Sequence, residues 1–442
     1  MTTMLSRTVR WPAGSGPRQV INSVRRLGWG VADQGISSLS NFALGLFVAR
    51  SFGASNFGAF TLAYVTYTVV INAARGLATD PLVVRYSGDA SGGWVASGSP
   101  HRWRSATSAA TGTALVVGVA AGVMCVIAGL LLPDPLGPVF VALGIALPGL
   151  TLQDSWRFAF FACGRGSASF INDLVWTVLL ILSLVVMHAQ GDGSAARCLL
   201  AFGGTAALAA ALGAIQARVL PRPLRARAWL RAHHQISVPY LVENLSISGA
   251  SQLRSFVLGA AAGLAAVGYV RASEILMGPF FVLLMGISQV AVPEASRVFH
   301  RNSRHLARFC FILGGLLAAA AVAWGLILMT VFPLGPGQAL LKELWMPTSQ
   351  LLPAITLTVA AASFSTAATA GLRAMGVARR SLRAQLAASA AYAIAGSLGA
   401  ILGGALGSSW GVTAALGFSA LVWWHQLRTA LSDHHAVAEV AR

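Results

Sequence analysis

The sequence predicts an all-α, polytopic membrane protein with twelve transmembrane helices. Of its 442 residues, 56% are hydrophobic and only 10% are charged, whereas about a quarter of the residues of a soluble domain are charged. Apolar segments of about 20 residues, long enough to cross the hydrocarbon core, recur along the whole chain. The four cysteines stand singly, without the spacing of a metal site or a disulfide framework. We therefore expect no metal or other cofactor.

Each span is predicted from its length and apolar content. The twelve segments are 31–50, 57–79, 106–132, 138–162, 168–188, 196–217, 237–258, 268–292, 308–332, 347–371, 384–405 and 410–427. Proline removes a backbone donor, so we expect bends at Pro148, Pro239, Pro279 and Pro353. The glycines at 399, 403 and 407 recur every fourth residue, which predicts close packing of one face of span 11.

Arginine placement predicts the orientation. Basic residues gather in both tails and in the gaps after even-numbered spans, whereas the gaps 133–137 and 406–411 contain none. The positive-inside rule then places both termini in the cytoplasm. The net charge of +18 lies in these flanks and on no soluble module, so we expect no nucleic-acid partner. The predicted parts are a cytoplasmic segment 1–30, an N-lobe 31–217, a basic interfacial linker 218–236, a C-lobe 237–427 and a cytoplasmic tail 428–442.

The two halves share a pattern. A shift of 210 residues places Asp33-Gln34 over Glu243-Asn244, Gly53 over Gly263 and Gly58 over Gly268. A shift of 212 residues places Gly164 over Gly376. Six spans separate the copies, so both halves have the same orientation, as in transporters built from parallel repeats around a central site. We expect two six-helix lobes with the transported molecule between them.

Three stretches carry a resemblance to a known family. They are WGVADQGISSLSNFALGLFVARSFGASNFGAF with ATDPLVVRYSG (78–88), LQDSWRFAFFACGRGSASFINDLVW (152–176) and GLAAVGYVRASEILMGPFFVLLMGISQVAVPEASR (263–297). They resemble the bacterial polysaccharide flippases, the O-antigen and exopolysaccharide exporters of the multidrug/oligosaccharidyl-lipid/polysaccharide (MOP) exporter superfamily.

The resemblance implies a protein of the bacterial cytoplasmic (inner) membrane that moves undecaprenyl-pyrophosphate-linked oligosaccharide to the outer leaflet. It implies alternating access between two lobes, a cationic central cavity and coupling to an ion gradient. Membrane lipids, a polysaccharide polymerase and chain-length machinery are the further partners that we expect. The related lipid II flippases have fourteen spans and arginines nearer the inner half of their first helix, whereas Arg50 lies at the outer end here.

Arginines within the spans are candidates for substrate contacts, because ionisable groups in the membrane are costly and usually face a cavity or a partner. A guanidinium offers paired donors to a phosphate. We expect Arg75 to contact the headgroup near the inner side, and Arg254 and Arg271 near the outer side, with Arg50 a weaker candidate. In the alternative, Arg50 and Arg271 reach the outer headgroups and Arg271 pairs with Glu274.

The intramembrane acids are candidates for gating or ion coupling: Asp33, Glu243, Asp80 and Glu274. Asp33 and Glu243 could bind and release a cation, or close an inner gate by pairing with Arg75 or Arg85. In the third explanation, these acids only stabilise the N-terminal ends of their helices through the helix dipole. Asp154 and Arg157, three residues apart, are expected to neutralise each other within one helix.

Two other functions compete with the flippase. A multidrug cation antiporter of the same superfamily would need acids in a neutral cavity, whereas the arginines here favour an anionic substrate. A membrane polysaccharide polymerase or ligase, the enzyme alternative, needs a large outer loop, and the predicted outer loops are short. The sequence contains no G-x-x-x-x-G-K-[ST] phosphate loop, which argues against ATP-driven pumping. We therefore expect a transporter rather than an enzyme.

Overall fold

The computed structural model describes residues 17–86, 100–191 and 193–440, and helices form almost all of these segments. The N-terminal helices are α1 (Pro17–Ser51), α2 (Gly53–Ala74), the π-helical turn η1 (Arg75–Thr79), α3 (Asp80–Tyr86), α4 (Pro100–Leu131), α5 (Leu136–Ala162), α6 (Gly166–Gln190) and α7 (Ala195–Ala217). The later helices are α8 (Ala226–Ala262), α9 (Leu264–Leu276), α10 (Gly278–Arg301), α11 (Leu306–Thr330), α12 (Pro336–Leu341), α13 (Trp345–Ser349), α14 (Leu352–Ala374) and α15 (Ala378–Val440). No β-strand occurs in these described ranges.

The helices suit a membrane by length and composition. Eight described stretches are long and apolar enough to cross a bilayer. Each of the twelve predicted spans lies, to within a residue, inside one helix or inside a helix pair joined by a short break. Helix α15 holds the spans 384–405 and 410–427, and non-helical backbone at Gly403 and Gly404 lies near the end of the first. Many large apolar side chains are exposed on the surface; Leu131, for example, is 81% exposed and Met124 is 70% exposed. A soluble monomer seldom exposes so much apolar surface. The chain is therefore a multi-pass membrane protein.

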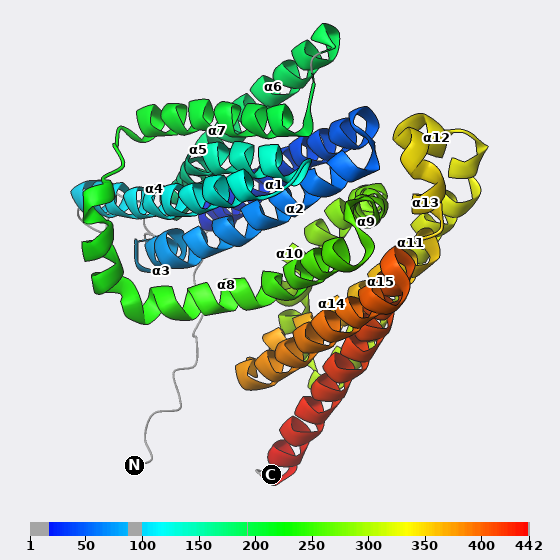
Figure 1. The fold of residues 1–442 in the computed structure, drawn as a ribbon. Coiled ribbons are helices and arrows are strands. Elements are labelled where there is room, and N and C mark those ends of the chain that lie inside the picture. The colour runs from blue at the N-terminus through cyan, green and yellow to red at the C-terminus, as the bar shows by residue number, and fades with distance from the viewer. Residues whose placement is uncertain (1–16, 87–99, 192, 441–442) are drawn as a thin grey trace.

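Helix grouping is visible in Figure 1. Helices α1 to α7 form one group, the N-terminal bundle, and α9 to α15 form a second group, the C-terminal bundle. Helix α8 runs from the first group to the second. The two bundles approach each other near α9 and spread apart toward the end where α3 and the beginning of α8 lie (Figure 1). We call this the arginine-rich end, because Arg85, Arg104 and the loop 218–225 lie there.

The matched glycines of the two halves adopt matched conformations. Gly53 and Gly263 open α2 and α9 with φ angles of 75° and 84°, and Gly164 and Gly376 both have a φ of 71°. Positive φ strains residues that have a Cβ atom, so glycine is the natural residue at such turns. The internal sequence match therefore extends to the backbone.

Gly58 and Gly268, also matched in sequence, bring α2 and α9 into close contact. A Cβ atom on Gly58 would lie 1.8 Å from the carbonyl oxygen of Leu264, and one on Gly268 would lie 2.7 Å from that of Ala54. Both distances are below van der Waals contact. Only glycine allows the first helical turns of α2 and α9 to pack backbone to backbone, and this contact joins the two bundles.

The four prolines fall into two classes. Pro148 and Pro239 lie inside α5 and α8, whereas Pro279 and Pro353 lie in the first turns of α10 and α14. Proline in a first turn removes no helical hydrogen bond, so at Pro279 and Pro353 the predicted spans are interrupted rather than bent within one helix. At Pro279 the chain instead breaks into two helices, α9 and α10, joined at Met277.

Candidate functional site between the two bundles

A cavity of about 850 Å³ lies between the bundles. Its walls come from α1, α2, α8, α9, α10, α14 and α15, so both bundles contribute to it. The polar residues that line it are Ser38, Asn41, Tyr64, Arg254, Arg271, Glu274, Thr358 and Tyr392. Binding pockets for small molecules typically measure 300–1,000 Å³ and combine apolar walls with a few polar groups. This cavity has that character.

Arg254, Glu274 and Arg271 form a charged group in the cavity wall. The Nη2 of Arg254 donates to Oε1 of Glu274 across 3.0 Å, and the Nη1 of Arg271 donates to Oε2 across 3.1 Å. One carboxylate therefore lies between two guanidinium groups, and one positive charge remains in excess. The Nε of Arg254 is buried and has no hydrogen-bond partner, so donor capacity is also left over.

Aromatic rings support both arginines. The guanidinium carbon of Arg254 lies 5.5 Å from the ring centroid of Tyr392, and that of Arg271 lies 5.3 Å from that of Tyr64. A cation over a ring face is attracted by the ring quadrupole. Gly396 leaves room for the Arg254 stem, because a Cβ atom there would lie 2.9 Å from its Cδ. These contacts fix each guanidinium without using its hydrogen-bond donors.

Helix α1 presents a polar stripe to the same cavity. Gly35, Ser38, Asn41 and Phe42 all line it, and residues three and four apart lie on one face of a helix. Ser38 and Asn41 therefore lie on the side of the opening span that faces the cavity. The hydrogen bond from Gln34 Nε2 to Ser38 Oγ, at 3.4 Å, extends the stripe toward the arginine-rich end.

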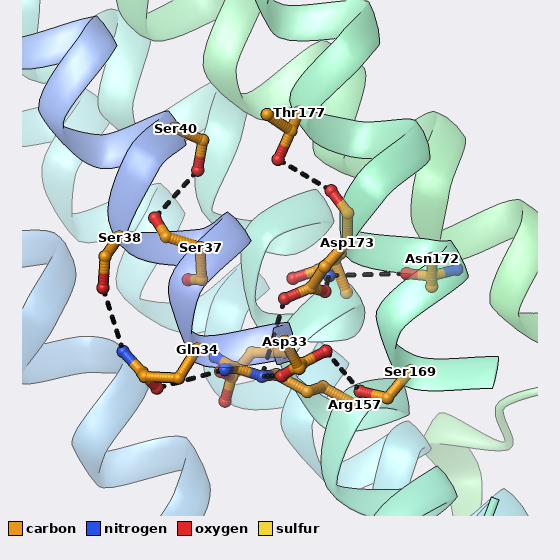
Figure 2. Close-up of polar contacts among 12 residues, drawn as sticks. Asp33, Gln34, Ser37, Ser38, Ser40, Arg157, Ser169, Asn172, Asp173 and Thr177 are labelled. Carbon is orange, nitrogen blue, oxygen red and sulfur yellow. Dashed lines mark hydrogen bonds and ion pairs between the residues drawn. The ribbon is translucent and has the colours of Figure 1, made fainter. Parts of the chain in front are cut away.

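A second polar group lies inside the N-terminal bundle, between α1, α5 and α6 (Figure 2). The Nε of Arg157 donates to Oδ2 of Asp33 at 2.5 Å and lies 3.6 Å from Oδ2 of Asp173. Oδ1 of Asp33 accepts from Ser169 at 3.0 Å, and Oδ1 of Asp173 accepts from Gln153 at 2.7 Å. Asp33 and Asp173 are almost fully buried, at 0% and 1% exposed.

Arg75 and Asp154 extend this group toward η1. The Nε and Nη2 of Arg75 donate to the two oxygens of Asp154 at 2.9 and 2.6 Å. With Arg157 between Asp33 and Asp173, the N-terminal bundle buries three carboxylates with two arginines. If all five side chains are ionised, one negative charge is left uncompensated.

The predicted arginines divide between these two groups. Arg254 and Arg271 line the cavity, as does Glu274, which pairs with both. Arg75 is not among the lining residues, and its guanidinium is paired with Asp154. Arg50 is exposed at the end of α1 and is also absent from the lining.

Two of the pairings considered for the acids differ from those in the structure. Asp33 pairs with Arg157 and with neither Arg75 nor Arg85. Asp154 and Arg157 do not neutralise each other, because each is paired with a residue of another helix. Asp80 follows η1 and accepts a hydrogen bond from Asn244 at 2.8 Å. The side chain of Glu243 lies outside the described residues.

Sequence reasoning missed Asp173, Tyr64 and Tyr392. Asp173 is an acid within a predicted span, so the rule that intramembrane charges are functional candidates applies to it as well. Tyr64 and Tyr392 gave no such signal, because a tyrosine in an apolar helix is an ordinary packing residue. Only the helix arrangement places their rings against Arg271 and Arg254.

Comparison with known proteins gives the fold. No protein-family model and no curated protein matches the sequence. An inward-facing multidrug resistance MATE transporter of the MOP superfamily matches with a TM-score of 0.67 and 13% identity, over 90% of this chain and 94% of that one. The lipid II flippase MurJ, in an inward closed conformation, matches with a TM-score of 0.66 and 11% identity, over 91% of this chain and 87% of that one.

A third solved structure is a MOP superfamily transporter from Pyrococcus furiosus, for which a binding pocket of reverse polarity suggests a different function. It matches with a TM-score of 0.57 and 14% identity, over 94% of this chain and 96% of that one. All three matched proteins are transporters or flippases. Identities this low establish the architecture alone. The chain therefore has the same fold as these solved MOP superfamily proteins.

Proposed function

We propose that the protein is a flippase that moves a lipid-diphosphate-linked oligosaccharide across the bacterial inner membrane. One observation carries the proposal: Arg254 and Arg271 share a single carboxylate in the wall of the inter-bundle cavity. The lining therefore has an excess of positive charge and a buried donor, the Nε of Arg254, without a partner. An anionic headgroup would neutralise the excess charge and accept a hydrogen bond from this donor, whereas an organic cation would do neither.

The diphosphate would bind by competing with Glu274. A phosphate oxygen can accept from the same guanidinium donors that Glu274 now occupies, and charge-assisted hydrogen bonds to phosphate are strong and often bidentate. Glu274 keeps the two arginines positioned while no substrate is bound. The polar stripe of Ser38 and Asn41 offers hydroxyl and amide groups to sugars across the cavity. The lipid tail stays in the bilayer beside the bundles.

The proposed ion-coupling site is the buried group of the N-terminal bundle. Its carboxylates outnumber its arginines by one, so binding of a proton or a sodium ion would neutralise it. Asp33 belongs to α1, the helix whose polar stripe lines the cavity. A cation bound beside Asp33 can bias the position of α1 only if it binds one conformation more tightly than the other. In this way α1 would link the two sites.

The direction of access follows from the arrangement of the bundles. The positive-inside rule assigns the arginine-rich end to the cytoplasm, and the bundles spread apart toward this end (Figure 1). The two matched structures with the higher TM-scores are both inward conformations. With twelve spans and cytoplasmic termini, the protein would thus be in an inward conformation, with its bundles apart on the side of the substrate's leaflet of origin. The two lobes of residues 31–217 and 237–427 would rock about the contact between α2 and α9.

The proposal is tested with purified protein in proteoliposomes that contain a lipid-diphosphate-linked oligosaccharide. Accessibility of the glycan to an external lectin reports flipping, and uptake of a fluorescent organic cation is measured in parallel. We expect flipping by the wild type and at least about a tenfold loss in Arg254→Ala, since hydrogen bonds to charged groups contribute about 1.5–3 kcal/mol.

The control is Arg304→Ala, which removes an exposed arginine that does not line the cavity. It should flip as the wild type does. Cation uptake without flipping would support the multidrug alternative, to which the fold applies equally. Undiminished flipping by Arg254→Ala at equal protein content would remove Arg254 from the site.

A further inference from the structure

A second pocket lies at the arginine-rich end of the N-terminal bundle. It measures about 420 Å³ and is lined by Arg104, Ser105, Ser108, Arg218, Val219, Leu220 and Arg222. Its walls are the first turns of α4 and the loop that follows α7. It shares no lining residue with the inter-bundle cavity.

The loop that forms this pocket is fixed on α4. The backbone N–H of Arg222 donates to the carbonyl of Ser108 at 2.9 Å, and the hydroxyl of Ser108 donates to the carbonyl of Leu220 at 2.7 Å. Gly112 lies one turn further along the same face of α4, and a Cβ atom there would lie 2.4 Å from the backbone of Arg222. Ser108 and Gly112, four residues apart on α4, thus hold the loop, and Arg104 lies four residues before Ser108 on the same face.

Among the residues that the structure describes, the three arginines of the pocket have no acidic partner. No carboxylate of the described residues lies within ion-pair distance of Arg104, Arg218 or Arg222. Arg218 also adopts a left-handed backbone, with a φ of 52°. Such a conformation is strained for a residue with a Cβ atom and favours glycine. The presence of arginine where glycine would suit the backbone better indicates a role for the guanidinium group.

Exposed apolar side chains lie on the loop and in the last turn of α7 before it. Leu224, Leu220 and Ile215 are 99%, 76% and 72% exposed. In water these side chains would be unfavourable, but at the boundary of a bilayer they can enter the acyl region while the arginines remain at headgroup depth. The pocket therefore combines phosphate-binding charge with a surface suited to acyl chains.

We propose that this pocket binds the phosphate headgroup of an anionic phospholipid from the cytoplasmic leaflet. Basic pockets between membrane helices on the cytoplasmic side suit such headgroups. The three guanidinium groups would donate to the phosphate oxygens, and the lipid would join α4 to the loop that leads into α8. The site is separate from the transport cavity, so the proposal is independent of the substrate.

The test uses the full chain in nanodiscs of phosphatidylcholine with increasing mole fractions of phosphatidylglycerol. Native mass spectrometry gives the phosphatidylglycerol occupancy, and thermal unfolding gives the stabilisation. The triple variant Arg104→Gln, Arg218→Gln, Arg222→Gln is compared with a charge-matched triple variant, Arg304→Gln, Arg308→Gln, Arg428→Gln. The control arginines are exposed residues on the C-terminal bundle and do not line the pocket.

An arginine at an anionic membrane surface changes affinity about fivefold, so the pocket triple variant should bind phosphatidylglycerol about 100-fold more weakly. The control should bind as the wild type does. Equal binding by the two triple variants would overturn the proposal. So would stabilisation of the wild type by inorganic phosphate as strong as that by phosphatidylglycerol, because a free phosphate would then be the ligand.

If the triple variant does not fold, Arg218→Gly supplies the same test. Glycine adopts the left-handed conformation freely, so this variant removes the charge and relieves the strained backbone. We expect a folded protein with about fivefold weaker phosphatidylglycerol binding. Unchanged occupancy in this variant would exclude Arg218 from the pocket and overturn the site as proposed.

Discussion

Arg254 of α8 and Glu274 of α9 form an ion pair of 3.0 Å in the wall of the inter-bundle cavity. Arg254 is only 5% exposed, so its charge is compensated mainly by this one carboxylate, which Arg271 shares. An anion that enters the cavity and Glu274 therefore compete for the same donors. In this cavity, an ion pair between the arginines and a bound anion can replace the ion pair with Glu274.

Removal of the Glu274 charge should strengthen binding of an anionic headgroup. In Glu274→Gln both arginines remain but their competitor is neutral, so we expect severalfold tighter binding of a soluble sugar diphosphate, measured by calorimetry in nanodiscs. Arg254→Lys is the companion variant: it keeps the charge but loses the planar fork, and binding should weaken. Weaker binding by Glu274→Gln would contradict the competition between Glu274 and the headgroup.

Neutralising Asp173 should uncouple transport from the ion gradient. Asp173→Asn leaves Asp33 and Asp154 to balance Arg157 and Arg75, so the excess carboxylate disappears. We expect flipping that no longer responds to an imposed proton or sodium gradient, with headgroup binding unchanged. Ser40→Ala, in the same helix as Asp33 but bonded only to the carbonyl of Ser37, is the control and should keep the response. A gradient response that survives in Asp173→Asn would place the coupling site elsewhere.

Gly58 should be intolerant of a methyl group. Its Cβ atom would lie 1.8 Å from the Leu264 oxygen, whereas no atom lies within 4 Å of a Cβ on Gly315 in α11. Overpacking costs about 1–3 kcal/mol, so Gly58→Ala should lower the thermal unfolding temperature. Gly315→Ala should be neutral or slightly stabilising, because alanine is a better helix former than glycine. Equal unfolding temperatures for the two variants would show that α2 and α9 do not pack as described.

A larger side chain at position 396 should weaken headgroup binding in the cavity without removing a charged group. A Cβ atom there would lie 2.9 Å from Cδ and 3.1 Å from Cγ of Arg254, so Gly396→Val should displace the guanidinium from Glu274. We expect severalfold weaker headgroup binding at near-normal expression. Gly417→Ala, whose added Cβ meets no atom within 4 Å, is the matched control. Normal binding in Gly396→Val would mean that the position of Arg254 is not critical.

Acid should loosen the contact between α8 and the end of α3. The Nε2 of His233 in α8 lies 3.4 Å from the hydroxyl of Tyr86 in α3. Burial, opposed by the bond to the Trp229 carbonyl, lowers the pKa of His233 below its usual value. The folded protein then binds fewer protons than the unfolded chain, so stability falls as the pH drops below the ordinary pKa of histidine, about 6.5. Unfolding temperatures between neutral and mildly acidic pH should fall more in the wild type than in His233→Phe. Identical pH profiles would contradict this role for His233.

Sequence reasoning was most successful where the controlling interactions are local. The turns at Gly53 and Gly263 share a positive φ because each backbone conformation depends on a few neighbouring residues, and a repeat preserves those residues. Arg254 and Arg271 could be selected as cavity residues because a charge within a span must find a polar environment. Long apolar segments likewise predict helices, because a backbone that crosses lipid must form its hydrogen bonds within itself.

Partner choice among the buried charges depended on the tertiary structure. Sequence spacing offers Arg157 only the neighbour Asp154 on its own helix, yet α1 and α6 bring Asp33 and Asp173 closer. Arg75 faces Asp154 for the same reason, which removes it from the cavity. By itself the sequence determined a helical membrane protein with two similar halves and costly charges inside its spans. Only the packing of the helices decided which charges meet, because ion pairs form at a few ångströms and the rotation of each helix is set by all of its neighbours.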